Sequence, residues 1–186
     1  MSACAVSRRR SSTGAVLLLV TVVTAAGWIT AGAAAPADPL APGAIAPAFE
    51  ATGLDGGTLA LTSLRGRVVI LNFWGIACPP CRIEMPELEK IHRRYAGLGL
   101  AVVGIEEMNA TPNDARRFAA AIGVRFPLAL DPGERIGRLY RLEAHPTTVV
   151  IDRQGRIAWI NAGYLRGDER EIDQAVRAAL AVPSHP

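Results

Sequence analysis

Apolar residues along the chain form short runs whose spacing predicts strands alternating with helices. The runs Val68–Phe73, Leu100–Ile105 and Thr147–Ile151 are continuous and rich in β-branched residues, as is typical of strands buried on both faces of a sheet. A helix is expected over 79–95, and Ile172, Ala175, Val176, Ala179 and Leu180 form a stripe at helical spacing in a C-terminal helix. This alternation predicts an α/β fold with helices flanking a central sheet.

Turn and capping residues predict the smaller elements between these runs. Phe49–Leu61 has the pattern of a β-hairpin turning at Asp55-Gly56-Gly57. Thr111 followed by Pro112 is typical of a helix start. Three further elements are expected: a strand over 126–130, a short helix over 135–140, and a strand over 157–160 that pairs antiparallel with Thr147–Ile151. The sheet is therefore expected to be mixed, and neither a repeat nor a second domain is indicated.

The first 35 residues differ in character from the rest. Arg8, Arg9 and Arg10 precede an uncharged, largely apolar stretch from Ala15 to Ala35. This arrangement is that of a signal peptide or an N-terminal membrane anchor whose arginines remain in the cytoplasm. Residues 36–47 are rich in proline and alanine and are expected to be an extended linker, and 48–182 are expected to form the folded domain.

Charge gives no reason to expect a nucleic-acid partner. The chain has 20 basic and 17 acidic residues, a net charge of +3. The three N-terminal arginines account for this excess, because no acidic residue precedes Asp38. The remainder of the chain is balanced and lacks the basic excess of a nucleic-acid-binding domain.

Cys78 and Cys81 are the cysteines that remain after the N-terminal segment, which contains Cys4. A disulfide between residues three apart closes too small a loop to stabilise a fold substantially. The three histidines are not spaced as zinc ligands with this pair, so no metal and no cofactor is expected. Redox chemistry of the two thiols is the remaining interpretation.

The position of the pair favours that chemistry. Cys78 lies where a buried strand gives way to a helix, and Pro79 suits the first helical position because its missing N–H loses no bond there. Helix dipole and backbone N–H groups at a helix N-terminus favour the thiolate. Cys78 is therefore expected to be the exposed, attacking sulfur, and Cys81 the shielded sulfur that resolves the mixed disulfide.

The chain resembles the TlpA/ResA-like thioredoxin family over roughly residues 43–181. The resemblance rests on Asn72-Phe73-Trp74, Cys78-Pro79-Pro80-Cys81, Glu84-Met85-Pro86 and His145-Pro146-Thr147-Thr148. It implies a thioredoxin-like fold with an N-terminal β-hairpin extension, and an extracytoplasmic thiol-disulfide oxidoreductase. It also implies a cis bond before Pro146, opposite the cysteines.

The resemblance assigns roles to further residues. Glu84 lies one helical turn after Cys81 and could accept its proton, since Asn72 stands where thioredoxin has a buried aspartate. A helix-dipole role is the alternative for Glu84. His145, Pro146 and Trp74 are expected at the substrate-binding surface. Protonated His145 could stabilise the Cys78 thiolate, or it could be a solvent-exposed loop residue.

Four positions depart from what the family suggests or remain open. Ala77 stands where the family commonly has tryptophan beside the first cysteine, which removes a flat apolar surface there. Thr147 follows Pro146, where the cytochrome-maturation branch of related reductases often has glutamate. Glu106 and Glu107 follow a strand at the edge where α/β active sites form, but are expected to end the strand in a solvated loop.

The resemblance to the TlpA/ResA-like family implies a reductant of protein disulfides outside the cytoplasmic membrane, in the periplasm or on the membrane's outer face. Its substrates would be proteins with disulfides or CxxC sites, such as apocytochrome c or the cysteines of oxidase copper centres, and its electrons would come from a membrane thiol carrier. Two alternatives stay open: a disulfide oxidant, and a metal-binding assembly chaperone using Cys78, Cys81 and His145.

Overall fold

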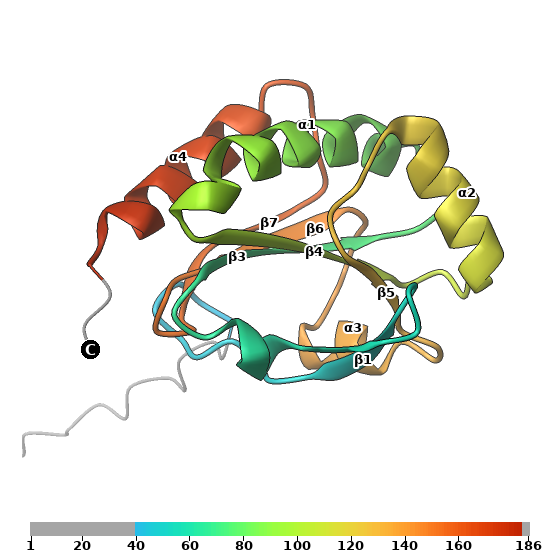
Figure 1. Cartoon of the computed structure of the whole chain (residues 1–186), viewed down its shortest axis with the longest axis horizontal. Helices are drawn as coiled ribbons and strands as arrows, with labels where there is room; N and C mark the ends of the chain where they lie inside the picture. Colours follow the sequence, from blue (N-terminus) through green and yellow to red (C-terminus); the bar gives the residue numbers. More distant parts are fainter. Residues whose placement is uncertain (1–39, 184–186) are drawn as a thin grey trace, which may run out of the picture. The chain divides into compact units, whose positions relative to one another are not determined.

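A computed structural model describes residues 40–183. Its core is one mixed sheet of seven strands in the order β2-β1-β5-β4-β3-β6-β7 (Figure 1). The strands are β1 (Glu50–Gly53), β2 (Thr58–Ala60), β3 (Val68–Trp74), β4 (Leu100–Glu106), β5 (Leu128–Leu130), β6 (Thr147–Ile151) and β7 (Ile157–Ala162). The helices are α1 (Pro79–Tyr95), α2 (Pro112–Ile122), α3 (Arg135–Leu139) and α4 (Glu169–Ala181), with 3₁₀ helices η1 (Leu61–Leu64) and η2 (Ala96–Leu98).

Strand β3 is central because it is apolar on both faces and buried along its whole length. It pairs parallel with β4 and antiparallel with β6. Since β6 runs opposite to β3, the start of β6 lies beside the end of β3, with Phe73 paired to Thr147. The loops that leave β3, leave β4 and enter β6 therefore meet at the same end of the sheet, where β3 and β4 finish and β6 begins.

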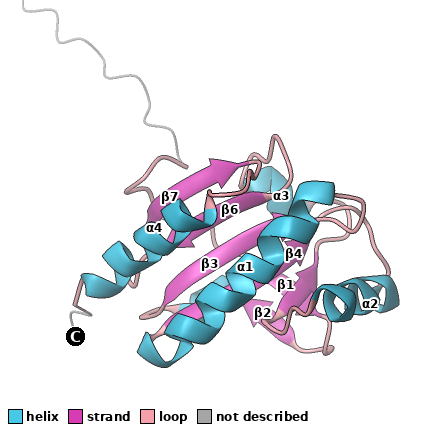
Figure 2. Ribbon diagram, turned by 90° about the horizontal axis from the view of Figure 1, so that it is seen from above, coloured by secondary structure: helices cyan, strands magenta, loops and turns pink. Residues whose placement is uncertain are grey.

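Helices cover both faces of the sheet, as Figures 1 and 2 show: α1 and α4 lie on one face and α3 on the other. Alternation along β3 supplies both cores, since Ile70 packs with the α1 and α4 side chains and Leu71 with α3 and the hairpin. The predicted α/β architecture, with its mixed sheet and N-terminal strands, is confirmed.

The N-terminal hairpin extends the sheet. Strand β1 pairs antiparallel with β2 and with β5, so the hairpin forms one edge of the sheet. Residues 40–47, expected to belong to the extended linker, instead pack on the domain: Leu40 and Ala46 are buried, and the Ala46 N–H donates to the Gly155 carbonyl at 2.9 Å. This stretch contains apolar side chains, and burying them against the domain is more favourable than exposing them to water. This explains the difference from the expected extended linker.

The predicted signal peptide or anchor over 1–35, and the linker residues before Leu40, lie outside the described residues. Within 40–183, no helix combines the length and the apolar character needed to cross a bilayer.

Candidate functional site

The two cysteines form a disulfide at the N-terminus of α1, with an S–S distance of 2.01 Å. Cys78 is the residue before the helix, and its Sγ accepts a hydrogen bond from the Cys81 backbone N–H at 3.2 Å. Cys78 retains 5% exposure, whereas Cys81 has none. The sequence predicted an exposed Cys78 and a shielded Cys81; Cys78 is the more accessible of the two, but it is itself buried in the disulfide form.

Beneath the disulfide, Glu84 belongs to a buried polar network that joins three elements. Its Oε2 accepts from Asn72 Nδ2 of β3 at 2.7 Å, and its Oε1 accepts from the Thr148 hydroxyl of β6 at 2.8 Å. Asn72 Nδ2 also donates to Thr148 Oγ1 at 2.9 Å. The carboxyl group is thus held on both oxygens, one turn of helix from Cys81.

Burial raises the pKa of Glu84 from 4.5 to about 7, even though the hydrogen bonds from Thr148 and Asn72 act in the opposite direction. A buried carboxylate loses its hydration, and two neutral donors replace only part of it. A pKa near neutrality suits proton transfer in both directions. Sequence reasoning missed Thr148, although a second threonine in an otherwise apolar buried strand was a signal that its hydroxyl had a partner.

The peptide bond between His145 and Pro146 is cis. Pro146 is buried, and its carbonyl accepts from the Gly163 N–H at 2.6 Å. In 40–183, no group hydrogen-bonds the backbone N–H or C=O of His145. These two groups lie at the same end of the sheet as the cysteines, where an extended substrate segment could pair with them.

The surroundings of the His145 imidazole differ from those expected for a group that stabilises the Cys78 thiolate. Its Nε2 is buried and has no hydrogen-bond partner in the described part of the chain. Burial lowers the pKa of His145, and the carboxylates of Glu134 and Glu106 only partly oppose this. A lowered pKa makes the protonated ring, and with it cationic stabilisation of the Cys78 thiolate, less favourable.

Trp74 lies in the core and not at the surface expected for substrate binding. Its side chain is fully buried and stacks on Phe118, with ring centroids 5.0 Å apart. The Arg82 guanidinium carbon lies over the Phe118 ring, 4.6 Å from its centroid. Because β3 is covered by helices on both faces, its last side chain turns into the core and cannot contact a partner directly.

Glu106 and Glu107 are buried, which corrects the expectation of a solvated loop end. Glu106 Oε1 and Oε2 accept from the N–H groups of Met108 and Ala110 at 3.1 and 2.9 Å. Burial, followed by the nearby carboxylate of Asp131, raises the pKa of Glu107 to about 8. The Glu106 side chain organises the loop from within, a role that its polarity alone could not indicate.

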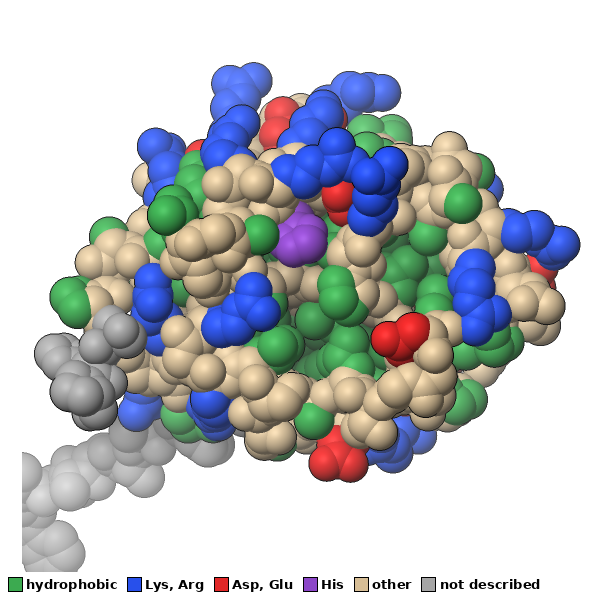
Figure 3. Space-filling view, viewed as in Figure 1, with side chains coloured by type: hydrophobic (Ala, Val, Ile, Leu, Met, Phe, Trp, Pro, Cys, Tyr) green, Lys and Arg blue, Asp and Glu red, His purple; other side chains and the backbone are tan. Residues whose placement is uncertain are grey.

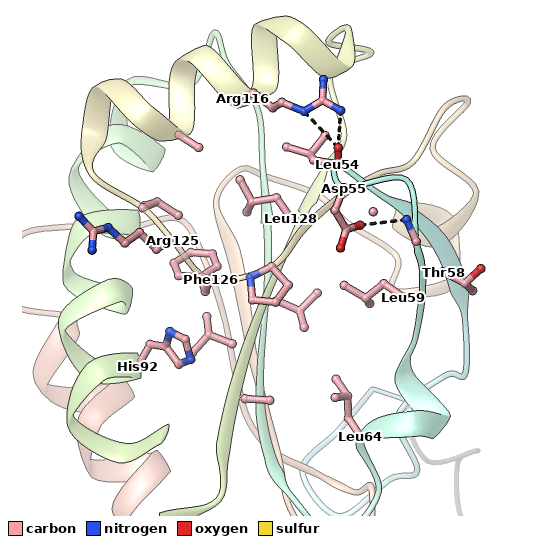
Figure 4. A pocket seen from close by; sticks show the side chains of 18 of the residues that line it. Leu54, Asp55, Thr58, Leu59, Leu64, His92, Arg116, Arg125, Phe126 and Leu128 are labelled. Atoms are coloured by element: carbon pink, nitrogen blue, oxygen red, sulfur yellow. Dashed lines mark hydrogen bonds between the residues drawn. The ribbon is translucent and has the colours of Figure 1, made fainter. Parts of the chain in front are cut away.

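A cavity of about 680 Å³ lies elsewhere, between the hairpin, α1, α2 and the first half of β4 (Figure 4). Figure 3 shows this hollow with an apolar floor and basic side chains near its rim. Its lining contains neither cysteine, nor Glu84, nor Pro146. It is therefore separate from the redox site.

Comparison with known proteins places this geometry in a family. The AhpC/TSA family model matches residues 42–160. The thiol-disulfide oxidoreductase ResA of Halalkalibacterium halodurans is 34% identical over 115 residues, 62% of this chain and 65% of ResA. The chain thus spans slightly less than two thirds of this curated relative's length.

Two further proteins extend the match. The thioredoxin-like protein YneN of Bacillus subtilis is 36% identical over 128 residues, 68% of this chain and 74% of YneN. A Chlorobium tepidum structure described as a thiol:disulfide interchange protein, DsbE, is 33% identical with a TM-score of 0.72, and the match covers 76% of this chain and 99% of that one. Since the family match spans well over half of the sequence and these relatives exceed 30% identity, the chain belongs to the AhpC/TSA family, among its thioredoxin-like, ResA-related members.

Proposed function

We propose that this protein is an extracytoplasmic thiol-disulfide oxidoreductase that reduces protein disulfides through Cys78 and Cys81. One observation carries the proposal: a disulfide at a helix N-terminus in which Cys78 retains slight exposure and Cys81 has none. The names of the relatives support the same reaction class.

The reaction proceeds in two exchanges. The Cys78 thiolate attacks one sulfur of the substrate disulfide, a new S–S bond forms, and the other substrate sulfur leaves as a thiolate. Cys81 then attacks Cys78 Sγ, which releases the second substrate sulfur and leaves the Cys78–Cys81 disulfide. Cys81 must lose its proton in this second step, and Glu84, in its carboxylate form, is the proposed acceptor one turn away.

The direction of electron flow is part of the proposal. A reductase in an oxidising compartment needs a supply of electrons, which we assign to a membrane thiol carrier. CxxC sites of apocytochrome c or of oxidase copper centres are the substrate class implied by the ResA-like relationship. Residues 1–35 would export the domain and either be removed or remain as an anchor.

Substitution of each cysteine separates their roles. Cys78→Ser should abolish reduction of a protein disulfide, because no outer thiolate remains. Cys81→Ser should retain the first attack and accumulate mixed disulfides, visible as adducts that disappear with dithiothreitol. Adducts on Cys81 in the Cys78→Ser protein, without any on Cys78 in the other variant, would reverse the assignment.

The redox potential of the pair tests the direction. Equilibration with thiol buffers should give a value near that of thioredoxin, about −270 mV, and not near about −120 mV, the value of a strong oxidant. A value at the oxidising end would support the oxidant alternative. Tight binding of a metal by the reduced protein, lost in both cysteine variants, would support the chaperone alternative.

A further inference from the structure

The loop that follows β4 lies beside the loop that carries the cysteines. Strands β3 and β4 end in register, with Trp74 paired to Glu106. The Glu107 N–H then donates to the Trp74 carbonyl at 2.9 Å, which continues the pairing past the strand. The next residue, Met108, therefore emerges at the same edge as Cys78.

The position of Met108 is fixed from below by a buried carboxylate. Glu106 accepts from the Met108 N–H and from the Ala110 N–H, and its own side chain is 1% exposed. Between them, Asn109 has a φ of 56°, a left-handed conformation that asparagine tolerates better than most residues. The loop is thus tied at two points, while the Met108 side chain remains 44% exposed.

Met108 packs directly on Gly75, the first residue after β3. A Cβ atom at Gly75 would lie 2.1 Å from Met108 Sδ and 2.2 Å from its Cγ, so the thioether occupies the space that any other residue at 75 would need. The Gly75 carbonyl accepts from the Cys78 N–H at 3.1 Å. The partly exposed Met108 side chain consequently borders the turn that positions the attacking sulfur.

We propose that Met108 is a specificity-determining residue that contacts the substrate residue next to the cysteine attacked by Cys78. The partner is a polypeptide disulfide in which that neighbouring residue is apolar. Methionine suits this role because its unbranched, polarisable side chain adapts to apolar groups of different shape. Within this turn Ala77 is exposed but small and Ile76 is half-buried against the core, so Met108 offers a large exposed apolar side chain beside the turn.

This inference rests on the proposed reductase function, and its test uses the ratio of two activities. The full chain and its variants reduce two substrates: a peptide disulfide with leucine beside the attacked cysteine, and bis(2-hydroxyethyl) disulfide, which has no neighbouring residue. Met108→Ala should lower the ratio of the two kcat/KM values about 5- to 10-fold, the effect of losing one to two partly buried methylene-sized contacts. Leu98→Ala removes another exposed apolar side chain, in η2, and should leave the ratio unchanged.

A double-mutant cycle tests whether the contact with Gly75 sets the orientation of Met108. Gly75→Ala must displace the thioether and should lower the ratio about as much as Met108→Ala does. Met108→Ala introduced into the Gly75→Ala protein should then change it less than twofold, because interacting sites are non-additive. A second peptide with aspartate in place of leucine should show no dependence on residue 108.

Two results would overturn the inference while the reductase function stands: an unchanged ratio in Met108→Ala, or an equal fall in Leu98→Ala. Failure of the unmodified protein to reduce either substrate would instead contradict the proposed function. Circular dichroism of the variants confirms that each is folded, and Met108→Ala, at a partly exposed position, carries the test if Gly75→Ala does not fold.

Discussion

Glu84 is a carboxyl group placed where its ionisation is costly and its proton is useful. Its two oxygens are occupied by Asn72 and Thr148, neither of which is charged. The amide at position 72 therefore does more than replace an acid: it donates to the acid that α1 supplies. Because of this network we assign Glu84 a role in proton transfer, and not only the alternative role of stabilising the helix dipole.

Replacing Glu84 by glutamine should affect both stability and kinetics in a pH-dependent way. Because the pKa is raised on folding from 4.5 to about 7, the fold favours the protonated form, and the free energy of unfolding falls as pH rises through this window. Glutamine does not titrate. The free energy of unfolding of the oxidised variant, relative to that of the oxidised wild type, should therefore rise by roughly 3 kcal/mol between pH 4 and pH 8. Urea unfolding at several pH values measures this.

The same variant should resolve mixed disulfides more slowly above pH 7, where wild-type Glu84 is a carboxylate, while the first attack is less affected. Stopped-flow kinetics of a model disulfide separate the two steps. Equal rates in both steps at every pH would leave Glu84 with a structural role only.

Among the elements, α1 connects the redox site to the far end of the sheet. Its N-terminus holds Cys78, its first turns hold Glu84, and Glu89 lies further along at 5% exposure. Glu89 Oε2 accepts from the N–H groups of Arg125 and Phe126, at 2.9 and 3.2 Å, just before β5. A single carboxylate thus fastens the helix to the chain entering β5.

Glu89→Ala should destabilise the fold by about 2–4 kcal/mol, because two N–H groups lose their charged acceptor. Burial opposes ionisation of Glu89, but the bonds from Arg125, Arg93 and Phe126 outweigh it, and the pKa is lowered. The contribution of Glu89 is therefore present above pH 4.5 and is lost as pH falls through its lowered pKa. Glu87→Ala is the matched control: this residue pairs with exposed Lys90, and the change should cost less than about 1 kcal/mol. Similar losses in both variants would contradict the anchoring role.

For the whole molecule, redox state and stability are linked. The cysteine pair has one reduction potential in the folded protein and another in the unfolded chain. The difference between these potentials, converted to free energy, equals the difference in folding stability between the oxidised and reduced forms. In a strong oxidant the reduced form is the more stable one. The proposed reductant should behave in the opposite way.

Chemical denaturation should therefore show a higher midpoint for the oxidised protein than for the reduced one. For this two-electron couple, each 30 mV corresponds to about 1.4 kcal/mol. The stability difference and the measured potential must agree, which checks both. A reduced form that is clearly more stable would favour the oxidant alternative.

Local sequence patterns determined the frame of this protein. The apolar runs predicted β3, β4 and β6, and the α1 bounds, Pro79–Tyr95, match the expected helix. The hairpin around Asp55 and the Thr111 cap, whose hydroxyl accepts from the Asp114 N–H at 3.2 Å, also followed from residues close in sequence. These features depend on periodicity, turn chemistry and capping, which act over a few residues.

Only the tertiary structure decided the surroundings of each candidate side chain. Trp74 and His145 share the motif that carries the cysteines, yet packing turns the indole into the core and lowers the pKa of the imidazole. Glu106, polar in sequence, proved to be an internal anchor, and Thr148 a partner of Glu84. Burial, and the hydrogen bonds that it demands, arise between segments far apart in sequence, such as Asn72 and Thr148, which are 76 residues apart, and no local pattern encodes them.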